Sequence, residues 1–100
     1  MGLPRRSPLL PDWTTLKEWS GNGPKETETF QTETAEWRVN WSNAGGFLSV
    51  TVYDDGGKMV SLAANTKDEG KDTSYVHKKG RFYLKINATG KWSISVEENR

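Results

Sequence analysis

His77 and the loop carboxylates are the residues of this chain whose types could do chemistry, but their spacing builds no catalytic set. His77 is the only histidine and there is no cysteine, so we expect neither a zinc site nor a thiol nucleophile. A histidine base needs a nucleophile on its own face, and Ser74, three positions earlier on an extended chain, points the other way. Glu97 and Glu98 stand near a terminus, and no two carboxylates occupy core-facing positions that would shift their pKa values. The sequence therefore predicts no enzyme activity.

Acidic residues gather in the segments expected to be loops, where they could in principle supply oxygen ligands to calcium. They are Asp54, Asp55, Asp68, Glu69 and Asp72. The run Asp54-Asp55-Gly56-Gly57 lacks the alternating acidic spacing and the distal glutamate of an EF-hand loop. Glycine and aspartate are also the residues that tight hairpin turns require. We interpret this run as a hairpin turn, and predict no metal site and no cofactor.

Aromatic side chains divide into two groups by their phase along the chain. Trp37, Trp41 and Trp92 are in phase with aliphatic neighbours two residues away, so we expect them in the core. Tyr53 and Tyr83 are out of phase with their aliphatic neighbours and should face outward. If their strands share a sheet, the two tyrosines form a shallow aromatic platform. The residues predicted to edge that platform are Asn40, Lys85 and Asn87. A glycan or a protein segment is the ligand expected there.

The strands that position these residues are predicted by the alternation of apolar and polar residues, which has a period of two. Between Trp37 and Val96 apolar and polar residues alternate, with a turn signal about every ten residues. The apolar runs are Trp37-Val39-Trp41, Leu48-Val50-Val52, Val60-Leu62, Phe82-Leu84-Ile86 and Trp92-Ile94-Val96. Such runs, joined by short Gly, Asn and Asp turns, predict an all-β fold. We expect a single antiparallel, jelly-roll-like β-sandwich with one dry and one wet face on every strand.

The expected strands number seven or eight, and no window shows helical periodicity. They cover residues 16–19, 26–34, 37–42, 47–53, 58–64, 73–77, 81–87 and 91–97, with a longer polar loop at 65–72. Residues 1–12 hold three of the four prolines and no periodicity, so we expect a disordered N-terminal arm. The sandwich domain is expected to span residues 13–100.

Composition excludes several classes of partner. Fourteen basic and thirteen acidic residues give a net charge of +1, without the basic excess typical of nucleic-acid binding. No apolar run approaches a membrane span, and Met1–Leu10 is broken by prolines and does not resemble a signal peptide. We expect no membrane insertion and no nucleic-acid partner. We also expect the protein to be a monomer.

Five stretches resemble small jelly-roll-like modules of bacterial proteins, most closely the group that includes pre-peptidase C-terminal domains. They are Trp37-Arg38-Val39-Asn40-Trp41, Val52-Tyr53-Asp54-Asp55-Gly56-Gly57, Thr73-Ser74-Tyr75, Gly80-Arg81-Phe82-Tyr83-Leu84-Lys85-Ile86 and Trp92-Ser93-Ile94-Ser95-Val96. The resemblance covers residues 16–97. It implies a non-catalytic module of an exported or cell-surface bacterial protein, and hence an extracytoplasmic location.

The function predicted from the sequence is a non-catalytic binding or accessory module. One alternative is a carbohydrate-binding module that uses Tyr53 and Tyr83. Another is a structural or assembly protein that pairs through an edge strand.

Overall fold

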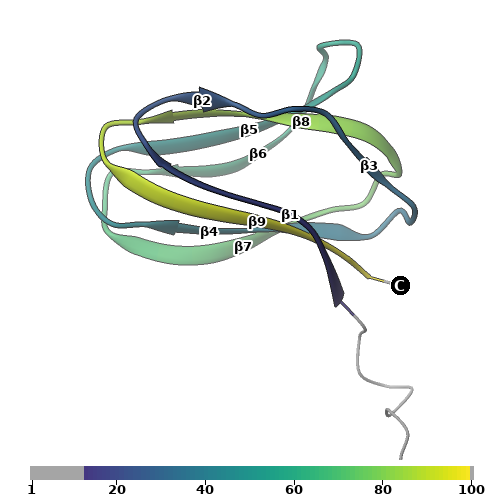
Figure 1. The fold of residues 1–100 in the computed structure, drawn as a ribbon, viewed down its shortest axis with the longest axis horizontal. Coiled ribbons are helices and arrows are strands. Elements are labelled where there is room, and N and C mark those ends of the chain that lie inside the picture. Colours follow the sequence, from purple (N-terminus) through teal and green to yellow (C-terminus); the bar gives the residue numbers. More distant parts are fainter. Residues whose placement is uncertain (1–12, 100) are drawn as a thin grey trace, which may run out of the picture.

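A computed structural model describes residues 13–99, which form nine β-strands and no helix (Figure 1). The expectations for residues 1–12 and for Arg100 lie outside this part of the chain. The strands are β1 (Trp13–Asn22), β2 (Lys25–Glu26), β3 (Phe30–Thr32), β4 (Trp37–Asn43), β5 (Leu48–Asp54), β6 (Met59–Thr66), β7 (Gly70–Val76), β8 (Gly80–Ala88) and β9 (Lys91–Asn99).

The strands form two antiparallel sheets that face each other, as the two layers of Figure 1 show. The first sheet has four strands in the order β1-β9-β4-β7. The second has the order β2-β8-β5-β6, with β3 also paired to β8. This alternation of early and late strands is the strand order of a jelly roll, so the predicted fold class is confirmed.

The strand count exceeds the predicted seven or eight because the segment 26–34 forms two short strands along β8. Thr27 lies between them. Its amide donates to the Leu84 carbonyl at 2.9 Å, and its buried hydroxyl accepts from the Leu84 amide at 3.0 Å. The Thr27 side chain therefore replaces one backbone hydrogen bond to β8 in the gap between β2 and β3.

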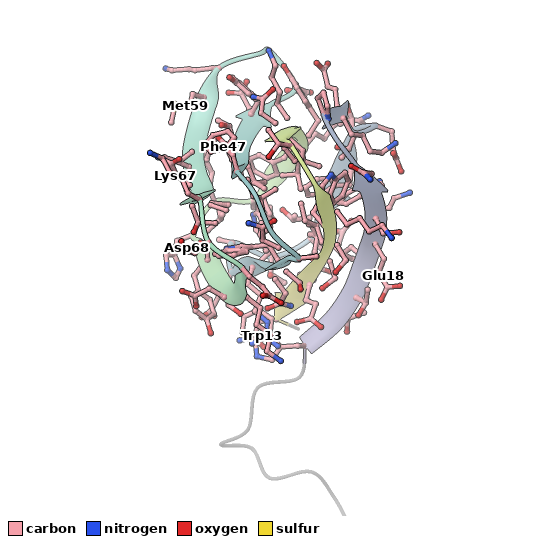
Figure 2. All side chains as sticks on the ribbon, turned by 90° about the vertical axis from the view of Figure 1, so that its left-hand side faces the viewer. Trp13, Glu18, Phe47, Met59, Lys67 and Asp68 are labelled. Carbon is pink, nitrogen blue, oxygen red and sulfur yellow. The ribbon has the colours of Figure 1, made fainter. Side chains whose placement is uncertain are left out.

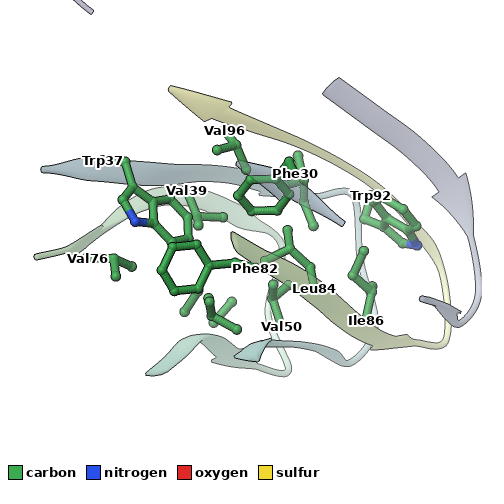
Figure 3. Close-up of a cluster of buried hydrophobic side chains, with 14 of the residues drawn as sticks. Phe30, Trp37, Val39, Val50, Val76, Phe82, Leu84, Ile86, Trp92 and Val96 are labelled. Carbon is green, nitrogen blue, oxygen red and sulfur yellow. The ribbon is translucent and has the colours of Figure 1, made fainter. Parts of the chain in front are cut away.

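The core lies between the sheets and is built from the inward positions that alternation predicts (Figure 3). Trp37 is fully buried, and its ring centroid lies 5.4 Å from that of Phe30 and 5.0 Å from that of Phe82. Its indole Nε1–H donates to the Lys78 carbonyl at 2.8 Å, so the polar atom of this large side chain is satisfied. Trp92 is also buried, and its indole donates to the Gly23 carbonyl at 2.8 Å.

Three of the expected core positions differ in the structure. Trp41 and Val60 pack against the core but are only partly buried. Leu62 is 47% exposed, so its expected place in the core was wrong. The reason is that the register between β5 and β6 shifts at two places, which moves Ala63 and Ala64 inward and turns Leu62 outward.

Two further expectations are corrected. The predicted loop 65–72 is short, because β6 continues to Thr66 and β7 already begins at Gly70. Glu98 was expected at an unremarkable terminus, yet its side chain is fully buried and accepts the Glu33 amide at 2.7 Å. Since β9 continues to Asn99, alternation with Val96 places Glu98 on the inward face.

Candidate binding surfaces

A trough of about 740 Å³ crosses the outer face of the four-stranded sheet. It is lined by three consecutive residues from each strand: 18–20 of β1, 93–95 of β9, 40–42 of β4 and 71–73 of β7. The middle residues of three of these triplets, Trp19, Ile94 and Trp41, pack toward the core, although Trp19 and Trp41 are only half-buried. The flanking residues of each triplet stand along the two sides of the trough. Asp72, the middle residue of the β7 triplet, is exposed.

One side of the trough is a row of hydroxyl groups. Cross-strand pairing places Ser20 beside Ser93, Ser93 beside Ser42, and Ser42 beside Lys71. Directly opposite residues of antiparallel strands have Cβ atoms about 5 Å apart, so the three serine side chains form a continuous line. No hydrogen bond joins their hydroxyls to another group within residues 13–99. These hydroxyls are therefore available to a ligand as donors and acceptors.

The other side is a polar network centred on Asn40. Its Nδ2 donates to Glu97 Oε1 at 2.8 Å and to Ser95 Oγ at 3.3 Å, and its Oδ1 accepts from Thr73 Oγ1 at 2.7 Å. Arg38 Nε donates to the same Glu97 oxygen at 2.6 Å. These bonds hold the side chains in one orientation and leave Asn40 engaged within the protein.

The electrostatics of Glu97 follow from this network. Partial burial raises the pKa of its carboxyl, but the hydrogen bonds and charge of Arg38, with the bond from Asn40, outweigh that effect, so the pKa is lowered. Glu97 is thus ionised at neutral pH and paired with Arg38, so these two charges neutralise each other and Glu18 is the remaining charge on this side of the trough.

An aromatic cluster stands one row beyond Asn40 on the same face. Arg38 Cζ lies 4.0 Å from the centre of the Trp13 ring, and Trp13 and Tyr75 have ring centroids 6.1 Å apart at 57°. Trp13 belongs to β1 and Tyr75 to β7, the two edge strands of this sheet. The two side chains therefore reach toward each other across β9 and β4, and form a raised wall beside the trough.

The outer face of the other sheet carries the predicted tyrosine pair. β5 and β8 are neighbours, Tyr53 is opposite Tyr83, and Lys85 and Asn87 follow on the same outer face. Asn40 lies on β4 in the opposite sheet, so its expected place at the edge of this platform was wrong. Alternation fixed which face of its own sheet Asn40 takes, but not which sheet contains its strand.

The two tyrosine rings stack on each other. Their ring centroids are 5.3 Å apart at an interplanar angle of 17°, so one face of each ring is covered by the other. Whether Tyr53, Tyr83, Lys85 and Asn87 bind a ligand stays a prediction.

The Asp54 turn has the hairpin role predicted for it. Asp54 Oδ1 accepts the amides of Gly56 at 3.0 Å and Lys58 at 2.9 Å, and Gly57 takes a φ of 84°. The backbone bond from Lys58 lowers the pKa of this exposed carboxyl. Among residues 13–99 no three His, Cys, Asp or Glu side chains are placed to hold a metal ion.

Comparisons with known proteins give a fold and no family. No family model and no curated protein matches this sequence. The SPBc2 prophage-derived protein YomS has a similar structure, with a TM-score of 0.63, 15% identity, and coverage of 96% of this chain and 100% of that chain. A protein of the disulfide-linked pili of Bacillus endospore appendages aligns over 99% of this chain and 98% of its own, with 8% identity and a TM-score of 0.46.

The likeness to YomS extends over the whole sandwich and concerns the fold alone. The resemblance to pre-peptidase C-terminal domains therefore stays a prediction. In the part of the chain that the structure describes, no helix is long and apolar enough to cross a membrane.

Sequence reasoning missed the serine row. Its signal was the alternation of Ser93 and Ser95 with Trp92, Ile94 and Val96, which marks the outer face of β9 as short and polar. That Ser20 and Ser42 extend the row depends on strand order, which alternation within a strand does not contain.

Proposed function

We propose that this chain is a non-catalytic binding module, and that it holds an elongated polar ligand across the outer face of the four-stranded sheet. The observation that supports this proposal is the trough of about 740 Å³ whose one side is a row of serine hydroxyls without partners among residues 13–99. Its volume is in the range of small-molecule sites, about 300–1,000 Å³.

The shape and chemistry of the trough suit binding better than catalysis. Its exposed side chains are mostly short hydroxyls and an amide, with the charged residues Glu18, Lys71 and Asp72 on its two edge strands. Glu97, the nearest carboxylate with a shifted pKa, is held ionised by Arg38 and Asn40, the opposite of what a general acid needs. A rigid sheet face with free hydroxyls can recognise a ligand without transforming it.

Filling the trough tests this proposal. Ser93 is exposed on a central strand, and an aromatic side chain is compatible with a strand, so Ser93→Tyr should block the trough in a folded protein. Ser49→Tyr, on a central strand of the other sheet and also facing outward, is the matched control. Binding to a glycan array and a panel of extended peptides is measured for both variants. The proposal predicts loss in Ser93→Tyr alone; equal binding by all three proteins, or binding by none, contradicts it.

A second candidate function, assembly through an edge strand, is favoured by one feature of β6. This strand is an edge of its sheet, has no charged residue, and exposes Met59 at 56% and Leu62 at 47%. Exposed apolar edge strands are templates for pairing with another chain. In Figure 2 Met59 lies on the side of the sandwich opposite Glu18, and β6 belongs to the other sheet than the trough.

The geometry of β6 limits that pairing to its first half. Ser74 Oγ donates to the Ala63 carbonyl at 2.5 Å, which covers the edge where β6 meets β7. A second copy could pair antiparallel about Val60 and Ser61, placing each Met59 opposite the Leu62 of the other copy. Light scattering over a range of concentrations tests this: assembly that Leu62→Lys abolishes supports it, and a monomer at every concentration excludes it.

The location of the protein belongs to the same proposal. The resemblance to modules of exported bacterial proteins supports a place at the cell surface. Fractionation of cells that express the complete natural gene tests it, and recovery in the cytosol alone contradicts it.

A further inference from the structure

We infer that the ligand of the trough is a neutral oligosaccharide, one ring of which stacks on the Trp13–Tyr75 wall while the next rings lie along the serine row. This inference rests on the proposed function, because it names the ligand class of the same site. It is carried by three features of the outer face: its hydrogen-bonding groups, its charge and its aromatic wall.

The hydrogen-bonding groups match a polyol. Each serine hydroxyl both donates and accepts, as does each hydroxyl of a sugar, so Ser20, Ser93 and Ser42 can pair with a ligand in either sense. The apolar residues in the middle of the trough, Trp19, Ile94 and Trp41, pack against the core and are half-buried or buried. The exposed groups beside them are mostly hydroxyls, which favours a ligand bound through hydroxyl groups.

The charge of the trough favours a neutral ligand over an anionic one. Glu18 and Lys71 belong to opposite edge strands and to opposite rows, so they stand at diagonal corners. Arg38 and Glu97 neutralise each other through their 2.6 Å contact. Asp72 on β7 adds a second carboxylate to the lining, so a polyanion would meet more repulsion than attraction.

The aromatic wall supplies the apolar contact that hydroxyls alone lack. Tyr75 is 53% exposed, and its ring is tilted by 57° to that of Trp13, so the rings do not cover each other's faces. This distinguishes the pair from Tyr53 and Tyr83, whose near-parallel stacking uses one face of each ring. Arg38 Cζ lies 4.0 Å from the centre of the Trp13 ring, so a cation–π contact covers one face of Trp13 and leaves Tyr75 as the more open stacking surface.

The dimensions fit a chain rather than a single sugar. The trough spans four neighbouring strands, about 14 Å from edge to edge at the usual strand spacing. The wall stands two residues farther along the strands, about 7 Å from the Asn40 row. A short oligosaccharide reaches from one to the other, while a monosaccharide contacts only one of them.

Calorimetry with defined probes tests the inference. The probes are linear neutral hexasaccharides of glucose, mannose, xylose and N-acetylglucosamine, with oligogalacturonate as the anionic counterpart and an extended peptide panel. We expect at least one neutral hexasaccharide to bind and oligogalacturonate not to bind. Trp13→Ala and Tyr75→Ser should each weaken binding about tenfold, the loss of one stacking contact. Tyr75→Phe should retain it, since the ring is kept.

Tyr83→Ser is the matched control, because it removes a partly exposed tyrosine from the other face. If peptides bind and Ser93→Tyr abolishes that binding while no hexasaccharide binds, the proposed function stands and the oligosaccharide inference fails. If Ser93→Tyr changes no binding at all, both fail. Binding of a hexasaccharide that Tyr83→Ser weakens, and that neither Trp13→Ala nor Tyr75→Ser weakens, also overturns the inference.

Discussion

Replacing Trp41 by phenylalanine should cost almost nothing, whereas the same change at Trp37 should be strongly destabilising. Trp41 is partly buried, and its Nε1 is buried without a hydrogen-bond partner among the described residues. Trp37 is fully buried, and its Nε1 donates to Lys78 at 2.8 Å. The two residues share a strand and an inward phase, so they differ chiefly in burial and in the state of this one donor.

The magnitudes follow from that difference. A change from Trp to Phe removes roughly 40 Å² of apolar surface, worth about 1 kcal/mol. At Trp41 the change also removes a buried donor that has no partner. Such a donor destabilises the folded state by about 1–3 kcal/mol, and its removal restores that stability. The net effect is therefore neutral or stabilising by about 1–2 kcal/mol. At Trp37 a cavity and the loss of a satisfied hydrogen bond add to the surface term, for a total of about 2–4 kcal/mol.

Urea unfolding followed by far-UV circular dichroism measures both values under one set of conditions. A common m-value would show that the unfolding transitions are comparable. We expect the free energies of unfolding of the two variants to differ by at least about 2 kcal/mol. Equal destabilisation by the two substitutions would refute the reasoning, since it would mean that the Trp41 donor carries no penalty.

Three further predictions concern acid stability, a glycine and the Asp54 turn. Folding lowers the pKa of Glu97, so the ionised carboxylate stabilises the folded protein at pH values above the ordinary pKa of a glutamate. This stabilisation is lost as the pH falls through the folded-state pKa. Glu97→Gln should therefore reduce the loss of stability to urea below about pH 4.5. Gly46→Ala should lower stability by at least about 1 kcal/mol in a thermal melt, because its φ is 79° and a Cβ would lie 2.5 Å from Thr89 Oγ1; Gly70→Ala, with open space around it, should be tolerated. Millimolar calcium should leave the melting temperature unchanged. A rise in melting temperature that Asp54→Ala removes would contradict this prediction and indicate a metal site.

The fold could be predicted from the sequence because alternation and turn residues are local signals. The inward phases of Trp37, Val50 and Ile86 were all correct, since a strand in regular register keeps its period of two. The phase failed at Leu62, where shifts in register between β5 and β6 break that period. The sequence of β6 alone does not predict such a shift, because the shift depends on pairing with a strand elsewhere in the chain.

The candidate site could be predicted only in part, for the same reason. The outward direction of Tyr53 and Tyr83 followed from phase, and their contact required only that β5 and β8 be neighbours. The trough joins β1, β9, β4 and β7, which are distant in sequence. Its serines have no distinctive spacing within any one strand, so only the jelly-roll topology brings them together.

The most direct test of the binding account is a map of backbone amide chemical shifts during titration with the neutral hexasaccharides. The account predicts that the shifts move on the outer face of the four-stranded sheet, at Ser20, Ser42, Ser93 and Ser95, and extend to Tyr75. Perturbations confined to Tyr53, Tyr83 and Lys85 on the other face, or none at millimolar ligand, would contradict it.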